Sequence, residues 1–131
     1  MTLRFDLIGV VASDMVASLA FYRALGLSFP DDAEAQPHVE AELPGGLRFA
    51  LDAVATITSF DPGFVLPAPG SRGVALAFRC DDPAEVDAVR GSLVAAGHTS
   101  ERAPWDAFWG QRYATVLDPD GNPIDLFAPV R

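Results

Sequence analysis

Alternation of hydrophobic and polar residues predicts β-strands, and apolar residues spaced by three or four predict helices. Residues 38–43 alternate strictly, and a Pro-Gly-Gly turn separates them from a second strand pattern. The apolar stripe of residues 15–25 follows Asp14, whose carboxylate can accept hydrogen bonds from free backbone NH groups at a helix start. The elements expected in the first half are strands at 4–12, 27–29, 38–43 and 47–52 and a helix at 15–25.

A similar pattern returns in the second half, after a segment rich in proline and glycine. That segment, residues 61–71, is interpreted as a linker. Asp82, Pro83 and Glu85 then supply the cap, the first position and the acidic third position of a helix. The elements expected here are strands at 73–79, 99–103, 112–117 and 124–127 and a helix that opens at Asp82 and ends at Gly97.

The two halves correspond element by element. Asp14 and Asp82 cap the two helices, and the hairpin turns begin at Pro44 and Pro119. An internal repeat of about half the chain indicates two copies of one β-α-β-β-β unit that together bury a hydrophobic face. We therefore expect a single α+β domain over residues 1–131, with one module at about 1–60, a linker at about 61–71 and a second module at about 72–131.

Charge and composition exclude several classes of function. The formal net charge is −9, and no basic stripe is present, so we expect no nucleic-acid partner. No apolar run approaches the roughly 20 residues of a membrane span, and no signal peptide is visible, so we expect no membrane association. The single cysteine, Cys80, rules out an internal disulfide framework and favours a cytoplasmic location.

Several short motifs, taken in order, resemble those of the vicinal oxygen chelate superfamily, which includes glyoxalase I, bleomycin resistance proteins and extradiol dioxygenases. The resemblance implies two βαβββ modules whose curved mixed sheets surround a cleft, with helices on the outer face, and a homodimer. It covers nearly the whole chain, but one fold hosts many functions. The motifs are Ser13-Asp14-Met15, residues 18–22, Leu25-Gly26-Leu27, Ala77-Phe78-Arg79, Asp81-Asp82, Asp118-Pro119-Asp120-Gly121-Asn122 and residues 124–127.

Alternation along the strands places one bulky apolar face of each strand under a helix and a smaller or more polar face toward the expected cleft. Trp105, Phe108 and Trp109 precede the last hairpin and are expected at the rim, where they stack on a ligand or fill a module or dimer interface. The candidate ligand-binding residues are His38, Glu40, Glu42, Arg48, Asp52, Trp105, Phe108, Trp109, Tyr113, Asp125 and Phe127.

The resemblance also implies four positions for metal ligands, which in metal-dependent members are typically His or Gln, Glu, His and Glu. Here they are Leu7, Ala50, Ala75 and Asp125, and three of these side chains cannot coordinate an ion. His38, Glu40 and Glu42 share a strand face but are interpreted as a polar surface rather than a metal site. We expect neither a metal nor another cofactor.

These observations favour a small-molecule binding protein close to the metal-free bleomycin-resistance-like members of the superfamily. Its ligand would be cationic or aromatic, and antibiotic resistance is one role of this kind. The alternative is a metal-dependent lyase, isomerase or dioxygenase, which would polarise vicinal oxygens of its substrate on the ion. A metal-free enzyme with Asp125 or Glu40 as general base is a third hypothesis. No catalytic residue is assigned.

Overall fold

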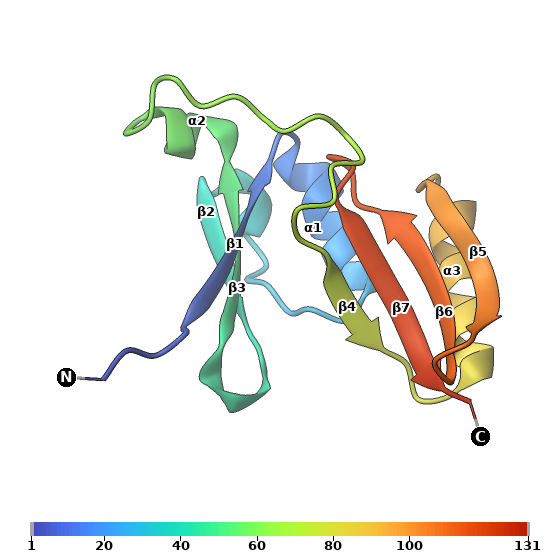
Figure 1. Ribbon diagram of the computed structural model, residues 1–131. Coiled ribbons are helices and arrows are strands. Elements are labelled where there is room, and N and C mark those ends of the chain that lie inside the picture. Colours follow the sequence, from blue (N-terminus) through green and yellow to red (C-terminus); the bar gives the residue numbers. More distant parts are fainter. Residues whose placement is uncertain (1, 131) are drawn as a thin grey trace. The chain divides into compact units, whose positions relative to one another are not determined.

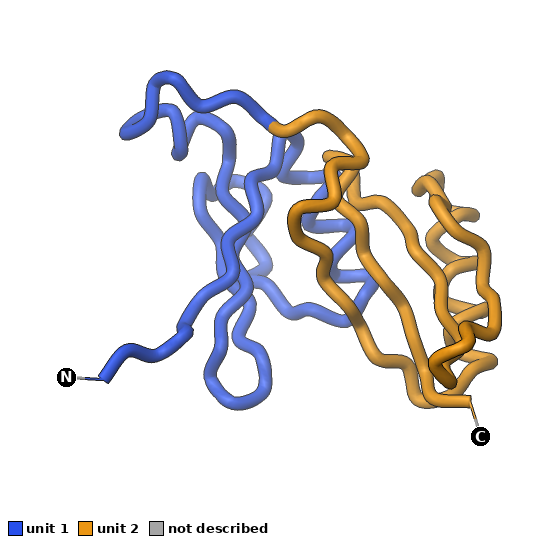
Figure 2. Tube along the Cα trace, viewed as in Figure 1, with its two compact units in different colours: residues 1–66 blue, residues 67–131 orange. Residues whose placement is uncertain are grey.

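Two mixed β-sheets, each accompanied by a helix, form most of the chain in the computed structural model (Figure 1). The structure describes residues 2–130. The chain divides into two compact units, Met1–Leu66 and Pro67–Arg131 (Figure 2), and the division falls within the segment expected to be a linker. The two βαβββ-like modules expected from the sequence repeat are confirmed.

The first unit contains a three-stranded sheet in the order β1-β3-β2. β3 is its central strand and pairs in parallel with β1 and antiparallel with β2. Two one-turn 3-10 helices, η1 and η2, interrupt the connections. The elements are β1 (Leu7–Ala12), α1 (Met15–Ala24), η1 (Ala33–Ala35), β2 (His38–Glu42), η2 (Pro44–Gly46), β3 (Arg48–Ala53) and α2 (Val54–Thr58).

Helix α1 begins where the sequence predicts. The Asp14 side chain accepts a hydrogen bond from the Ala17 backbone NH at 3.1 Å, which satisfies one of the free donors at the helix start. The helix contacts β3, and the Tyr22 and Phe49 rings lie 4.8 Å apart between centroids. Both side chains are buried, so aromatic packing attaches the helix to the apolar face of the sheet.

The strand expected at residues 27–29 is wrong, because this segment is irregular. The Leu27 NH donates to the Tyr22 carbonyl, and the Pro30 carbonyl accepts from the Arg23 guanidinium at 2.8 Å. Phe29 packs edge-on against Phe49, with ring centroids 6.3 Å apart. The backbone of this segment and of Pro30 therefore bonds to residues of α1, and the Phe29 ring packs against the buried Phe49. The segment is not a strand of the sheet.

The second unit contains a complete module with a four-stranded sheet in the order β4-β7-β6-β5. β7 pairs in parallel with β4 and antiparallel with β6, and β6 pairs antiparallel with β5. Helix α3 contacts β5, β6 and β7. The elements are β4 (Leu76–Arg79), α3 (Pro83–Ala95), β5 (Ser100–Ala107), β6 (Gln111–Leu117) and β7 (Pro123–Pro129).

Sequence signals place α3 accurately. The Asp82 carboxylate accepts from the Glu85 backbone NH at 2.9 Å, and the Glu85 carboxylate accepts from the Asp81 NH at 2.7 Å. These two bonds form a reciprocal cap around Pro83 at the first turn. Val86 and Leu93 lie seven residues apart on one face of the helix, and both are buried.

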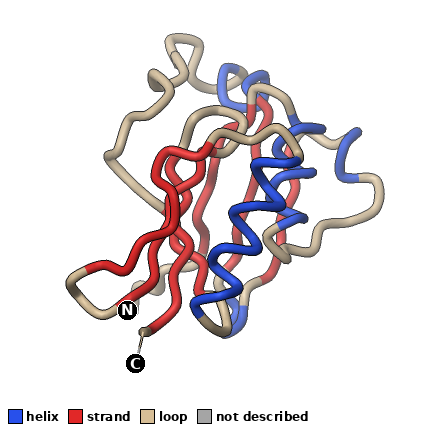
Figure 3. The backbone as a smooth tube through the Cα atoms, turned by 90° about the vertical axis from the view of Figure 1, so that its right-hand side faces the viewer, coloured by secondary structure: helices blue, strands red, loops and turns tan. Residues whose placement is uncertain are grey.

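Three features of the structure depart from the pattern in sequence. β4 is shorter than expected, and β5 extends to Ala107 and so includes Trp105. The short helix α2 has no cap signal in sequence, and a long stretch without helix or strand connects it to β4 (Figure 3).

Within residues 2–130 no helix has the length and apolar character that a membrane span requires.

The turn between β6 and β7 is held by one buried carboxylate. Asp118 accepts hydrogen bonds from the backbone NH groups of Asp120 and Asn122, both at 2.9 Å. Gly121 has φ +83°, and its carbonyl accepts from the Gly70 NH at 2.9 Å. A Cβ at Gly121 would lie 2.6 Å from the Pro69 Cβ, so the turn and the preceding segment need glycine here.

Replacing this glycine should cost more than replacing a glycine with the same backbone conformation in open space. Gly97 has φ +98°, and a Cβ added there would have no neighbour within 4 Å, so Gly97→Ala carries only the left-handed backbone cost of about 1–2 kcal/mol. Gly121→Ala adds an overlap worth about 1–3 kcal/mol more. Urea unfolding of both variants measures this difference, and equal losses would contradict the close packing.

Candidate functional site

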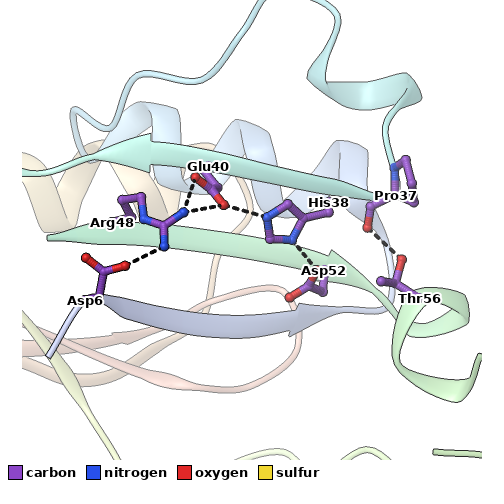
Figure 4. A network of polar contacts seen from close by, with 7 residues as sticks. All are labelled: Asp6, Pro37, His38, Glu40, Arg48, Asp52 and Thr56. Carbon is purple, nitrogen blue, oxygen red and sulfur yellow. Dashed lines mark hydrogen bonds and ion pairs between the residues drawn. The ribbon is translucent and has the colours of Figure 1, made fainter. Parts of the chain in front are cut away.

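Five polar side chains of the first unit form one connected cluster, called here the His38 network (Figure 4). Strand register brings them together, because His38 lies opposite Asp52 and Glu42 opposite Arg48 in the β2–β3 pair. Side chains two residues apart on a strand share a face. The members of the His38 network are Asp6, His38, Glu40, Arg48 and Asp52.

Both ring nitrogens of His38 face a carboxylate. Nδ1 lies 2.5 Å from an Asp52 oxygen, and Nε2 lies 2.8 Å from a Glu40 oxygen. Only the imidazolium form can donate from both nitrogens, so this geometry favours a charged ring. The hydrogen bond to Glu40, followed by that to Asp52, raises the pKa of His38. The same bond, followed by that from Arg48, lowers the pKa of Glu40.

Arg48 connects the rest of the network. Its Nη1 lies 3.0 Å from each Glu40 oxygen, and its Nη2 lies 2.6 Å from an Asp6 oxygen. Asp6 precedes β1, so the network crosses the whole sheet from β2 through β3 to the approach of β1 (Figure 4). The polar groups of His38, Glu40 and Arg48 are thus engaged with one another. The network is a set of mutually bonded polar side chains that connects the strands across the sheet surface.

The second unit places aromatic and polar groups together in what we call the aromatic–acid face. Trp105 lies opposite Tyr113 in the β5–β6 pair, and Tyr113 and Thr115 lie opposite Phe127 and Asp125 in the β6–β7 pair. Paired residues share a sheet face, so these side chains point the same way. The members of the aromatic–acid face are Trp105, Trp109, Tyr113, Thr115, Asp125 and Phe127.

Asp125 is buried, with 7% of its surface exposed. One carboxylate oxygen accepts from the Tyr113 hydroxyl and the other from the Thr115 hydroxyl, both at 2.8 Å. Among residues 2–130 it has no salt-bridge partner. Burial, followed by the bond to Asp125, raises the pKa of Tyr113 to about 12. Tyr113 is therefore a neutral donor at physiological pH.

The aromatic rings adjoin one another edge to face. Trp109 contacts Trp105 and Tyr113 at centroid distances of 5.4 and 5.3 Å, and Phe108 contacts Trp109 at 5.0 Å. The Trp109 indole NH donates to the Gln111 side chain at 2.8 Å. Phe108 is 92% exposed and Trp109 is 47% exposed, so the outer members of this cluster face solvent.

Sequence reasoning found most of these residues but not their partners. Asp6 lies within the strand expected at 4–12, but β1 begins at Leu7, and Asp6 is not among the candidate residues predicted from the sequence. Arg102 lies over the Trp105 ring, 5.8 Å from its centroid, and it was also missed. Two register shifts between β5 and β6 remove the simple alternation that would place it. Glu42 is exposed and shares the face of the His38 network through its position opposite Arg48.

The donor set does not fit the metal site that the resemblance implies. Leu7 and Ala50 lie on the polar face of the first sheet, and Ala75 lies just before β4. None of these three side chains carries a donor atom, and Asp125 alone supplies too few ligands for a divalent ion. Within the described part of the chain, no group of three or more His, Cys, Asp or Glu side chains is arranged to hold an ion.

The His38 network should make stability depend on pH. A folded-state pKa above the ordinary 6.5 means that the contribution of His38 is complete below pH 6.5 and is lost as pH rises through the raised pKa. The free-energy difference between wild type and His38→Gln should therefore be largest below pH 6.5 and shrink as the pH rises through the raised pKa of His38. NMR titration measures the imidazole pKa directly, with His98→Gln to assign the signals. A His38 pKa at or below 6.5 would refute the double pairing.

Comparison with known proteins places this architecture in a family. The model of the Glyoxalase/Bleomycin resistance protein/Dioxygenase superfamily matches residues 4–126. No curated protein matches the sequence at a significant level.

Solved structures show the same fold. A glyoxalase/bleomycin resistance protein/dioxygenase family enzyme from Burkholderia phytofirmans is 19% identical, with a TM-score of 0.80 over 98% of this chain and 100% of that one. A glyoxalase-related enzyme from Fulvimarina pelagi is 25% identical, with a TM-score of 0.78 over 97% and 88%. A lactoylglutathione lyase from Agrobacterium tumefaciens is 24% identical, with a TM-score of 0.66 over 95% and 92%. The chain belongs to the glyoxalase/bleomycin resistance protein/dioxygenase superfamily.

Proposed function

We propose that this chain is a metal-free small-molecule binding protein that takes a cationic aromatic ligand on the aromatic–acid face. The observation that carries the proposal is Asp125, a buried carboxylate with two hydroxyl donors and no salt-bridge partner among the described residues. Burying a charge is costly unless an opposite charge compensates it. A cationic group of a ligand would supply that charge.

The surrounding residues support an aromatic ligand. Trp109 and Tyr113 present ring faces and edges beside the acid, and Trp109 is half exposed. Aromatic side chains attract both planar rings and cations through the negative face of their π-systems. The charge of Arg72 lowers the pKa of Tyr113, but the Arg72 guanidinium is paired with Glu101. The net charge of −9 adds a general attraction for cations.

The His38 network is a weaker candidate for ligand contact. Its acids already have His38 or Arg48 as cationic partners, so a cationic ligand would have to displace an existing ion pair to reach them. Ligand contacts by Glu42, Phe108 and Phe127 stay predictions, as do the homodimer, a cleft enclosed by both modules and a role in antibiotic resistance. The proposal therefore centres on the second unit.

A pair of probes tests the role of Asp125. 2-Naphthylmethylammonium and the uncharged 2-naphthylmethanol share one ring system and differ in charge. We expect the cation to bind about tenfold more tightly, because it alone compensates Asp125. Asp125→Asn should remove this preference while calorimetric binding of the alcohol persists. Circular dichroism checks that the variant is folded.

Asp106→Asn is the matched control. Asp106 neighbours Trp105 on β5, so its side chain lies on the opposite face, and it pairs with Arg112 at 3.1 Å. Its loss changes the net charge by the same amount and should leave the preference for the cation intact. Equal effects of the two substitutions would indicate general electrostatics, and no binding of either probe would overturn the proposal.

Metal analysis separates this proposal from a metal-dependent lyase, isomerase or dioxygenase. Because Leu7, Ala50 and Ala75 offer no donor atoms, we expect substoichiometric metal in the purified protein. Titration with Zn²⁺, Ni²⁺, Mn²⁺ or Fe²⁺ should likewise show no tight uptake. One tightly bound ion per chain would contradict the metal-free assignment.

A further inference from the structure

One buried donor in the second unit has no partner. Among residues 2–130, the Trp105 indole nitrogen is the one buried side-chain nitrogen or oxygen without a hydrogen bond. The other indole, that of Trp109, donates to Gln111 at 2.8 Å. Buried polar groups in folded proteins almost always have partners, so an unpartnered donor calls for a specific explanation.

The position of Trp105 relates it to Asp125. Trp105 lies on β5, opposite Tyr113 on β6, and the Tyr113 hydroxyl donates to Asp125 on β7. The three residues thus lie on three adjacent strands, with their side chains on the same face of the sheet. Adjacent strands lie about 4.8 Å apart, and Asp125 lies two residues, about 7 Å, along β7 from the residue opposite Tyr113, so the backbones of Trp105 and Asp125 are separated by roughly 12 Å. The side chains of both residues extend from the same face, so a two-ring aromatic molecule with a functional group at each end is long enough to contact both.

The groups beside the indole can move aside. The Arg102 guanidinium lies over the Trp105 ring, and Trp109 contacts that ring edge to face. Both residues are exposed, and Trp109 is anchored through a single side-chain hydrogen bond to an adjacent strand residue. Rotation of exposed side chains is fast and requires no change in the sheet. A ligand that displaces them would contact the Trp105 ring, which carries the unpartnered NH.

We infer that the Trp105 indole NH is a specificity-determining donor, which bonds an acceptor oxygen of the ligand whose cationic group pairs with Asp125. This inference rests on the proposed function and narrows it. The ligand class is an aromatic ammonium compound that carries a carbonyl or similar oxygen at the end remote from its charge. Trp105 would then bind the oxygen at one end of the ligand and Asp125 the cationic group at the other, and Tyr113 lies between these two residues.

An isosteric pair of probes tests the inference. 6-Acetyl-2-naphthylmethylammonium and 6-isopropyl-2-naphthylmethylammonium differ in one carbonyl oxygen in place of a methyl group. The acetyl compound should bind wild type about fivefold more tightly, the usual effect of one added hydrogen bond. Trp105→Phe keeps an aromatic ring but removes the NH, so the preference should vanish. Circular dichroism checks that Trp105→Phe is folded.

NMR of the two indole NH protons gives a readout independent of affinity. The chain has two tryptophans, and the spectrum of Trp105→Phe assigns both signals. The acetyl probe should move the Trp105 signal downfield, as expected on formation of a hydrogen bond, and the isopropyl probe should not. Binding of both probes with no preference and no such shift would overturn this inference alone. Failure of both probes to bind would overturn the proposed function and this inference with it.

Discussion

The arrangement of the second unit depends on the alternation of one central strand, β7. Pairing with β4 on one side and β6 on the other fixes the register of β7. Ile124 and Leu126 are buried on the face that α3 covers, and Asp125 points to the opposite face. A shift of one residue would exchange the two sets and place a carboxylate in the apolar core. Asp125 is therefore tied to its hydroxyl partners by the same pairing that builds the core.

The two modules carry charged residues at different positions of their sheets and pair them with different partners. Ala50 lies opposite Glu40 in the first sheet, and Asp125 lies opposite Thr115 in the second. In the first unit the charged residues lie around Ala50 and compensate one another within the His38 network. In the second unit the acid stands on the central strand, is buried, and has neutral hydroxyl donors. The first sheet thus carries acids with cationic partners, and the second carries a buried acid whose partners are neutral hydroxyls.

Patterns of local origin were predictable from the sequence, and contacts set by distant residues were not. The helix caps at Asp14 and Asp82 and the turn at Gly121 follow from side chains a few residues away. The segment 27–29 looks like a strand, but Phe29 packs on the distant Phe49, and the Leu27 NH bonds to the Tyr22 carbonyl instead of to a neighbouring strand. Alternation assigned the faces of His38 and Asp125 correctly. It could not show that His38 has two acids as partners, because that depends on strand register.

The irregular edge of the second sheet explains the remaining gap. Register shifts in β5 lie between Ser100 and Arg102 and between Arg102 and Trp105, so the period of two is lost at these residues. Arg102 lies over the Trp105 ring there, and the Trp105 indole nitrogen has no hydrogen-bond partner among the described residues. Bulges of this kind re-aim side chains and are common beside binding sites. The irregular register and the unpartnered donor therefore occur at the same place on the edge strand, where alternation in sequence cannot predict the contacts of a side chain.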